Sequence, residues 1–310
     1  MKTGVAGPNI MGIQRRRKRR TLGDWIFDIF AHTVVALAAV ITVYPFIYVL
    51  SMSISSPDAV IAKEVFFLPK GFDLSAYRVV FADNEVWRGY GNTLWYTSVG
   101  TALNLLFTLL AAFALSKKRF FARRFFTFIF VFTMFFSGGM IPLFIVVVRL
   151  GLYNTRWAMI CVSLVTTWNL IICRTFFESL PEDLFESARL DGAGEWYTLF
   201  RIALPLSTPV IAVLTLFYAV GWWNSWFMFV LYSSDQSLQP LQIYLRRVLI
   251  TATPESLKEQ MPGGVFSEMA FAMLKIRYTV IIITVLPIIT VYPFLQKYFV
   301  KGVMIGALKG

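Results

Sequence analysis

Six long stretches of this 310-residue chain carry no Asp, Glu, Lys or Arg, and charged segments separate them. The uncharged stretches cover residues 29–57, 89–116, 125–148, 157–173, 202–234 and 278–296. A helix needs about 20 mostly apolar residues to cross the hydrocarbon core of a membrane. We therefore predict an all-α, polytopic membrane protein with six transmembrane helices, near residues 26–50, 92–115, 125–148, 157–177, 204–232 and 278–298.

Two of these predicted helices have unusual features. The stretch 125–148 contains Ser137-Gly138-Gly139 and then Pro142, residues that interrupt a helix, so a break is expected there. The stretch 157–173 is shorter than the others and is expected to extend through Phe177, with Arg174 reaching toward the lipid headgroups. Outside the spans, 58–91 reads as a structured loop, and 238–250 repeats Leu and Val at helical spacing.

Composition supports a membrane protein, because 57% of the residues are hydrophobic and only 15% are charged. The net charge of +12 would suggest nucleic acid as a partner of a soluble protein, but here the basic residues flank the apolar stretches. The basic run 15–20 precedes the first stretch, and further Lys and Arg residues lie in 117–124 and in the tail. This bias predicts that both termini are cytoplasmic. We expect a basic cytoplasmic segment, 1–23, followed by one transmembrane permease domain, 24–310, whose first helix is not cleaved as a signal peptide.

One polar and charged segment, 178–205, separates two long apolar stretches on the predicted cytoplasmic side. Pro181 followed by Glu182 and Asp183 is typical of the first turn of a helix. Asp191-Gly192-Ala193-Gly194 predicts a turn, and a second short helix is expected from Glu195. This helix–turn–helix would expose apolar side chains just outside the membrane, and such a surface needs a partner to cover it.

The spacing of residues in this segment resembles the EAA motif of the permeases of ATP-binding-cassette (ABC) importers. The resemblance rests on Glu186, Ser187, Ala188, Asp191, Gly192, Ile202, Leu204 and Pro205. Ser187 stands where the family usually has Ala. The resemblance implies the type I importer permease fold, with 178–205 as the coupling loop that docks on a cytoplasmic ATPase subunit.

The same resemblance implies the rest of the assembly: a second, homologous permease, two ATPase subunits that bind ATP and Mg²⁺, and an extracytoplasmic solute-binding protein. The chain itself would hold no cofactor and no metal, and would lie in the bacterial cell membrane. Substrate would cross by alternating access, driven by ATP hydrolysis in the partner subunits. Consistent with this division of labour, the sequence contains no phosphate-binding loop of the Walker type.

Other function classes find less support in the residues. An ion-coupled secondary carrier usually keeps carboxylates within the membrane, and no pair of them falls inside the predicted spans. A membrane-embedded enzyme or scaffold would need convergent acid, His or metal-binding groups, but the chain has one histidine, His32, and two cysteines without metal-ligand spacing. The chain is therefore predicted to be a transport subunit and not an enzyme.

An aromatic cluster at the end of the fifth stretch indicates a substrate class. The cluster runs from Trp222 to Phe229 and includes Asn224 and Ser225. Flat aromatic faces stack on sugar rings while amides bond to hydroxyl groups, but Trp residues also form a belt at the membrane interface. Both interpretations stay open. Under the first, the substrate path would include Asn169, Trp222, Trp223, Asn224 and Trp226.

The cluster, together with the segments 136–142, 150–155 and 299–310, resembles carbohydrate-importer permeases of the maltose-transporter type. The segments 136–142 and 150–155 are similar to the branch that handles oligosaccharides derived from polysaccharides, sometimes called lipoprotein-type sugar permeases. This resemblance implies oligosaccharide import. A non-sugar solute imported by the same kind of machine is the alternative.

Overall fold

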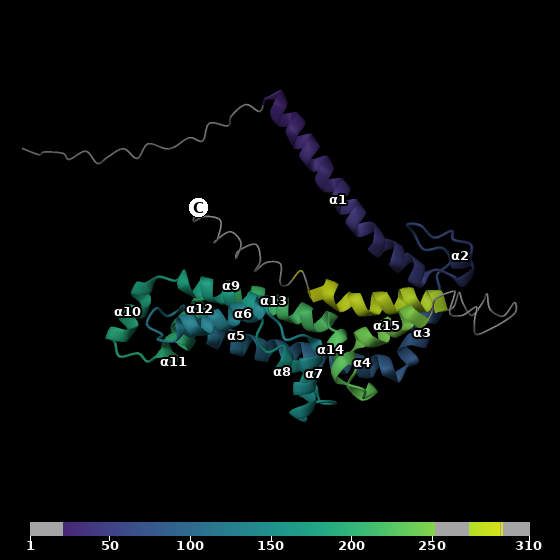
Figure 1. Ribbon diagram of the computed structural model, residues 1–310. Helices are drawn as coiled ribbons and strands as arrows, with labels where there is room; N and C mark the ends of the chain where they lie inside the picture. The colour runs from purple at the N-terminus through teal and green to yellow at the C-terminus, as the bar shows by residue number, and fades with distance from the viewer. Residues whose placement is uncertain (1–20, 252–272, 292, 294–310) are drawn as a thin grey trace, which may run out of the picture. The chain divides into compact units, whose positions relative to one another are not determined.

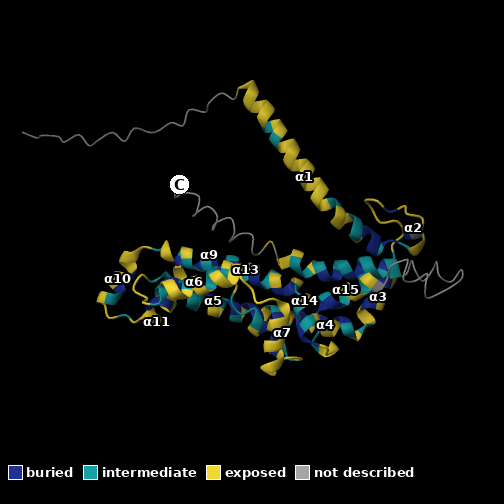
Figure 2. Ribbon diagram, viewed as in Figure 1, coloured by how far each residue is buried: buried dark blue, intermediate teal, exposed yellow. Residues whose placement is uncertain are grey.

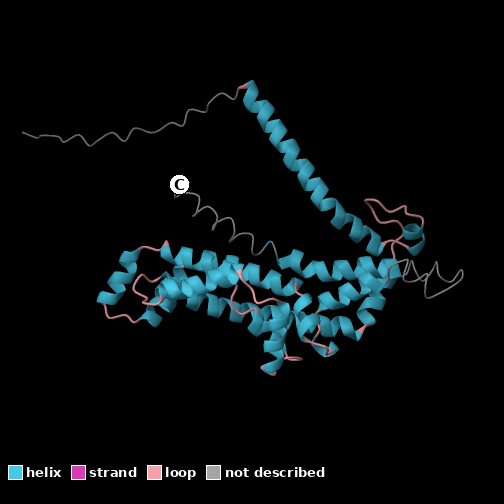
Figure 3. Ribbon diagram, viewed as in Figure 1, coloured by secondary structure: helices cyan, strands magenta, loops and turns pink. Residues whose placement is uncertain are grey.

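The computed structural model describes residues 21–251, 273–291 and 293. Contacts between Cα atoms divide the chain into two units, residues 1–48 and residues 49–310, which are described separately. The described residues are almost wholly helical, as Figure 3 shows, and an isolated bridge pairs Ser55 with Phe72. The predicted all-α class is confirmed.

The first unit consists of most of α1 (Leu22–Ile54), the predicted first span. Its apolar side chains are exposed on every face, as with Phe30 at 66% and Ile41 at 70%. A helix that is apolar all round is suited to lipid or to a protein interior and not to water.

The second unit is built around three helices that pack against one another: α5 (Thr101–Ser116), α9 (Thr167–Glu178) and α13 (Thr208–Asn224) (Figure 1). Their facing sides form one apolar core that includes Ala112, Leu170, Cys173 and Leu214, all at most 2% exposed. Cys173 is thus a packing residue. This core positions both candidate sites described below.

The second span is a longer helical rod than predicted. It begins at Asn84 and not near residue 92, and runs through α4 (Asn84–Trp95), a π-helical turn (Tyr96–Gly100) and α5. The polar first part folds as helix because Val86 is fully buried and Gly89 lies close to α15 (Leu241–Thr251). A Cβ atom at Gly89 would lie 3.1 Å from the Cα of Leu241. Packing against α15 therefore extends the helix beyond its apolar part.

Three spans are broken helices. The predicted break in the third span lies between α6 (Arg123–Phe135) and α7 (Met140–Arg149), which meet at 117°. The fourth span also breaks, by 53°, between α8 (Arg156–Val162) and α9. The fifth was predicted as one helix over 204–232, but it turns by 82° before Thr208 and ends at Asn224, after which α14 (Phe227–Tyr232) follows. The sequence did not predict these last two breaks.

The sixth span is the helix Met273–Val291; the part of the predicted range beyond residue 293 lies outside the described residues. Counting each bent pair as one span, the described residues contain up to six, in agreement with the predicted number. Short helices α2 (Pro57–Ile61), α3 (Ser75–Ala82) and η3 (Gln236–Leu238) complete the second unit. Burial is uneven in it: Figure 2 shows α5, α9 and α13 largely buried or half-buried, whereas α6 has no buried residue.

Candidate functional sites: a helical hairpin and a polar hollow

The segment predicted as a coupling loop folds as a helix–turn–helix, which we call the hairpin. It consists of α10 (Glu182–Leu190), α11 (Glu195–Tyr197), the π-helical turn η2 (Thr198–Ala203) and α12 (Leu204–Leu206). Within the second unit it lies at one end, and α3 and α4 lie at the other (Figure 1). Pro181 directly precedes α10, and Glu182 and Asp183 occupy its first turn, where the helix dipole favours acidic side chains.

Backbone hydrogen bonds explain the turn between α10 and α11. The N–H of Ala193 donates to the carbonyl of Ala188 at 2.9 Å, and the N–H of Gly192 donates to that of Arg189 at 3.0 Å. This pair of bonds is a Schellman motif, in which the residue after the cap takes a left-handed conformation. Gly192 is that residue, with φ of 81°. The glycine of the EAA-like spacing therefore sets the angle between the two arms of the hairpin.

Other residues of the motif anchor the hairpin to the helical core. Phe185 and Ala188 are the buried positions of α10, one turn apart from each other on one face. Ile202 and Leu204 pack against the core formed by α5, α9 and α13. Ala203 between them is fully buried. The structure thus gives Ala188, Ile202 and Leu204 a packing role.

The remaining motif residues face outward: Glu186, Ser187, Asp191 and Pro205 are exposed. Beside them the hairpin exposes large apolar side chains. Leu190 is 89% exposed and Trp196 67% exposed, and the Trp196 ring stacks on Phe200 with centroids 6.0 Å apart. The exposed apolar surface predicted for this segment is present and has no cover among the described residues.

A second candidate site is a hollow of about 770 Å³ between α9 and α13, which we call the polar hollow. Hydroxyl, amide and indole groups line it, and none of its lining residues is charged. Its volume is in the range of ligand-binding pockets. The residues that line it are Asn104, Ser163, Thr166, Trp168, Asn169, Leu216, Phe217, Tyr218, Val220, Gly221, Trp222, Asn224 and Ser225.

A buried amide holds the walls of the polar hollow together. Asn104, 1% exposed, donates from Nδ2 to the carbonyls of Ser163 (2.5 Å) and Leu164 (2.8 Å), and it accepts from Nε1 of Trp222 at 2.6 Å. The two carbonyls lie in the break between α8 and α9, so a single side chain satisfies the backbone groups that the break frees.

The structure brings three of the five predicted substrate-path residues to the polar hollow: Asn169, Trp222 and Asn224. Trp223 points elsewhere, because its Nε1 donates to the carbonyl of Thr284 at 3.1 Å. Trp226 lies under the guanidinium of Arg246, 3.6 Å from the ring centroid. The sequence had not indicated Thr166 and Trp168 as residues that line the site with Asn169, although both lie within the three positions that precede it.

No group of three or more His, Cys, Asp or Glu side chains that could bind a metal occurs in the part of the chain that the structure describes. The polar hollow and the hairpin therefore offer hydrogen bonds, apolar surface and mechanical contact. Neither contains a nucleophile paired with a base.

Residues 104–305 match the family described as "Binding-protein-dependent transport system inner membrane component". The chain is 41% identical to the protein LplC of Bacillus subtilis (strain 168), covering 92% of this chain and 95% of that protein. It is 37% identical to the polygalacturonan/rhamnogalacturonan transport system permease protein YtcP of the same strain, covering 92% and 99%. It also resembles a chain in the crystal structure of a bacterial ABC transporter involved in the import of the acidic polysaccharide alginate, with a TM-score of 0.81 and 35% identity over 91% of this chain and 99% of that one.

A component of this kind works with a solute-binding protein and with an ATPase, and the ATPase binds the nucleotide. It catalyses no reaction itself. The chain belongs to the family of binding-protein-dependent transport system inner membrane components and is the multi-pass permease subunit of an ABC importer.

Proposed function

We propose that this permease imports oligosaccharides through a path that includes the polar hollow. The observation that carries the proposal is the chemistry of the lining: amide, hydroxyl and indole groups with no charged side chain. A sugar presents hydroxyl groups to bond and apolar ring faces to stack, and this lining complements both.

The side chain of Asn169 is the best placed group for binding cargo. It is 6% exposed, lines the polar hollow, and has no hydrogen bond to another described residue. The fully buried polar atoms that lack a partner do not include the Asn169 amide, so its atoms are accessible from the polar hollow and free to bond to a ligand hydroxyl. Trp168 beside it is 59% exposed and offers a ring face for stacking.

Similarity to named proteins supports a carbohydrate cargo. The relatives whose names state a cargo include the YtcP protein and the arabinooligosaccharides transport system permease protein AraQ of Halalkalibacterium halodurans, which is 26% identical over 302 residues. The similar structure belongs to a transporter of an acidic polysaccharide. Oligosaccharides released from a polysaccharide are therefore the substrate class that we propose.

The hairpin is the element that we propose to couple ATP hydrolysis to transport. Its exposed apolar side chains, Leu190, Trp196 and Phe200, would dock on the ATPase subunit, and Glu186 would pair with a basic group there. A second, homologous permease would close the open side of the polar hollow. Both termini and the hairpin would face the cytoplasm, and the cargo would arrive from the binding protein at the opposite end.

The cargo proposal is tested with the partner solute-binding protein and with whole cells. Calorimetric titration with uronate-containing and neutral oligosaccharides should give binding to at least one of these sets, and cells should take up the same sugar in an ATP-dependent manner. Asn169→Ala should lower uptake at least tenfold without reducing the amount of assembled complex. Thr215→Ala is the control, because the Thr215 hydroxyl donates to the Ile211 carbonyl within its own helix. Binding of amino acids or inorganic anions in place of any sugar would contradict the proposal.

The orientation proposal has its own test. A single cysteine at Ser187, in a chain with Cys161→Ser and Cys173→Ser, should react with a membrane-impermeant thiol reagent only after the cells are opened. Labelling in intact cells would place the hairpin outside and overturn its role in coupling.

A further inference from the structure

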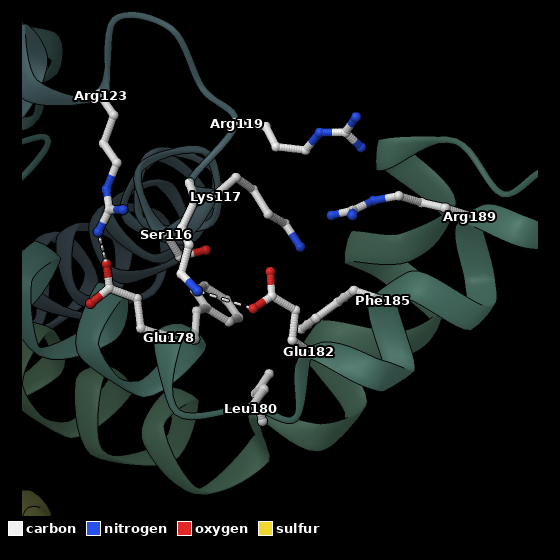
Figure 4. A pocket seen from close by; sticks show the side chains of 11 residues that line it. Ser116, Lys117, Arg119, Arg123, Glu178, Leu180, Glu182, Phe185 and Arg189 are labelled. Atoms are coloured by element: carbon white, nitrogen blue, oxygen red, sulfur yellow. Dashed lines mark hydrogen bonds and ion pairs between the residues drawn. The ribbon is translucent and has the colours of Figure 1, made fainter.

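Beside the hairpin lies a second hollow, of about 260 Å³, that the transport cycle described above does not use. We call it the basic hollow. Its lining comes from the end of α5 with residues 117–119 of the following loop, from the first residue of α6, from the end of α9 with Leu180, and from α10 (Figure 4). Five Lys or Arg residues but only two carboxylates line it: Lys117, Lys118, Arg119, Arg123 and Arg189 against Glu178 and Glu182.

The two carboxylates are already engaged. Glu182 forms an ion pair with Lys118 at 3.1 Å, and Glu178 pairs with Arg123 and, at 2.9 Å, with the Nε of Arg174. Lys117, Arg119 and Arg189 form no ion pair with any described residue. Figure 4 shows these three side chains pointing toward one another.

Three like charges that converge with no ion pair of their own repel one another, and a bound anion would relieve the repulsion. Lys117 is fixed in place, because its Nζ lies 3.6 Å from the centroid of the Phe185 ring and 4.2 Å from that of Phe113. Burial is the main cause that lowers the pKa of Lys117; the charge of Arg189 also lowers it, while the carboxylates of Glu195 and Glu182 raise it. Arginine guanidinium groups bind phosphate oxygens in a bidentate manner, which a small anion such as chloride does not exploit.

The surroundings of the basic hollow indicate which phosphate compound would bind. The loop 117–122 joins two spans, α5 and α6, and therefore lies at a membrane surface. A third hollow, of about 690 Å³, shares Lys118 and Arg123 with the basic hollow and continues along α6. This third hollow adds Arg124 to the cationic side, and its apolar side includes Phe121, fully exposed, and Phe128, 66% exposed.

We propose that an anionic phospholipid binds here, with its phosphate in the basic hollow and an acyl chain along the phenylalanine side chains of α6. Basic pockets at the ends of spans bind anionic headgroups in this way. Because Arg189 belongs to α10 and Arg119 to the loop between two spans, the bound headgroup ties the hairpin to the membrane surface. An effect of the bound lipid on coupling would depend on the function proposed for the hairpin. Lipid binding itself does not depend on that function.

The test uses the complete transporter, with its partner permease and ATPase, in nanodiscs of phosphatidylcholine with or without phosphatidylglycerol. Native mass spectrometry counts the retained phosphatidylglycerol, and the ATPase rate is measured against its mole fraction. Arg119→Gln should weaken retention about fivefold, and adding Arg189→Gln should weaken it by about the same factor again. Arg149→Gln removes an exposed charge from the end of α7 and should leave retention unchanged.

Arg119→Lys keeps the charge but loses the bidentate contact, so it should retain more lipid than Arg119→Gln and less than the unaltered protein, which separates the loss of a binding group from the loss of folded protein. Retention by Arg119→Gln equal to that of Arg149→Gln would overturn the proposal. Retained inorganic phosphate in place of phosphatidylglycerol would overturn it in favour of a soluble anion. Loss of the ATPase subunit from Arg119→Gln in phosphatidylcholine alone would overturn it in favour of an acidic surface on that partner. Lipid retention is measured without transport, so a failure of the proposed coupling role would not alter this result.

Discussion

At the residue scale, one buried ion pair joins the sixth span to the residues just before α3, at the end of the second unit away from the hairpin. Lys275, in the helix Met273–Val291, has a side chain that is 3% exposed, and it pairs with Asp73. Its Nζ also donates to the Asp73 carbonyl at 3.0 Å. The hydrogen bonds from Lys275 and then Ser75 lower the pKa of Asp73 to about 2. A charge so deeply buried depends on its partner, since desolvation would otherwise be uncompensated.

We expect Asp73→Asn to destabilise the protein by about 3 kcal/mol, because it leaves Lys275 buried and unpaired. Lys70→Gln is the control: it removes an ion pair with Glu64 in which both side chains are 55% exposed, worth at most about 1 kcal/mol. Thermal unfolding of the purified complex gives both values. A loss no larger for Asp73→Asn than for Lys70→Gln would contradict the assignment.

The same pair predicts how stability depends on pH. The pKa of Asp73 lies below its usual value of 3.8 in the folded protein, so the unfolded chain binds the proton more readily. The contribution of the pair is therefore fully present above about pH 4 and is lost as the pH falls toward 2. Unfolding measured across this window should show a smaller pH dependence for Asp73→Asn than for the unaltered protein.

A glycine decides the position of Trp222 at the polar hollow. Gly100 ends the π-helical turn, and a Cβ atom there would collide with the Trp222 indole ring. Gly91, in the same rod, has open space around the position of a Cβ atom. Gly100→Ala should displace Trp222, break its bond to Asn104 and lower uptake, whereas Gly91→Ala should be neutral or slightly stabilising, as alanine is in a helix. Equal uptake by the two variants would show that the indole position is unimportant.

At the element scale, sequence reasoning predicted those breaks that arise from local chemistry. The break between α6 and α7 is predicted by Gly138, Gly139 and Pro142. The turn of the hairpin is predicted by Gly192. The break between α8 and α9 carries no glycine or proline within 163–166. The break is possible because the side chain of Asn104, distant in sequence, donates hydrogen bonds to the two carbonyls that the break frees. No local sequence pattern reveals such a contact.

The angle between α10 and α11 depends on the backbone conformation of one residue, Gly192. Gly192 has a left-handed backbone, and nothing lies within 4 Å of the position of a Cβ atom. The cost of a side chain there is therefore conformational and not steric, about 1–2 kcal/mol for an ordinary residue and less for asparagine. Gly192→Val should open the hairpin and lower substrate-stimulated ATP hydrolysis, while Gly192→Asn should stay close to the unaltered rate.

Gly194→Ala is the matched control, because Gly194 lies in the same turn but has φ of −74° and open space around it. It should couple normally. If Gly192→Val hydrolyses ATP in response to substrate as well as Gly194→Ala does, the left-handed turn is not what holds the hairpin in its working position.

At the scale of the whole molecule, the sequence defined the number of spans and the polar segment between the fourth and fifth. It defined the substrate path only in part. The aromatic cluster 222–229 looked like a single unit, but a helix turns by about 100° per residue, so Trp222 and Trp223 face different neighbours. Trp222 reaches Asn104, and Trp223 reaches Thr284 on the sixth span. Which indole faces the polar hollow depends on the packing of α13 against two other spans.

The exposed apolar side chains at one end of the second unit supply the last prediction. Leu190 is 89% exposed and Trp196 is 67% exposed, on an element that carries the EAA-like spacing. Leu68, in the segment between α2 and α3, is 76% exposed and serves as a control for the general effect of removing a surface leucine. Burying a leucine or tryptophan side chain contributes about 1.5–3 kcal/mol, so Leu190→Ser and Trp196→Ser should each weaken association with the ATPase subunit at least tenfold, as measured by co-purification at decreasing concentration. Leu68→Ser should leave that association unchanged; a loss of ATPase with Leu68→Ser, or its full retention with both hairpin variants, would place the docking surface elsewhere.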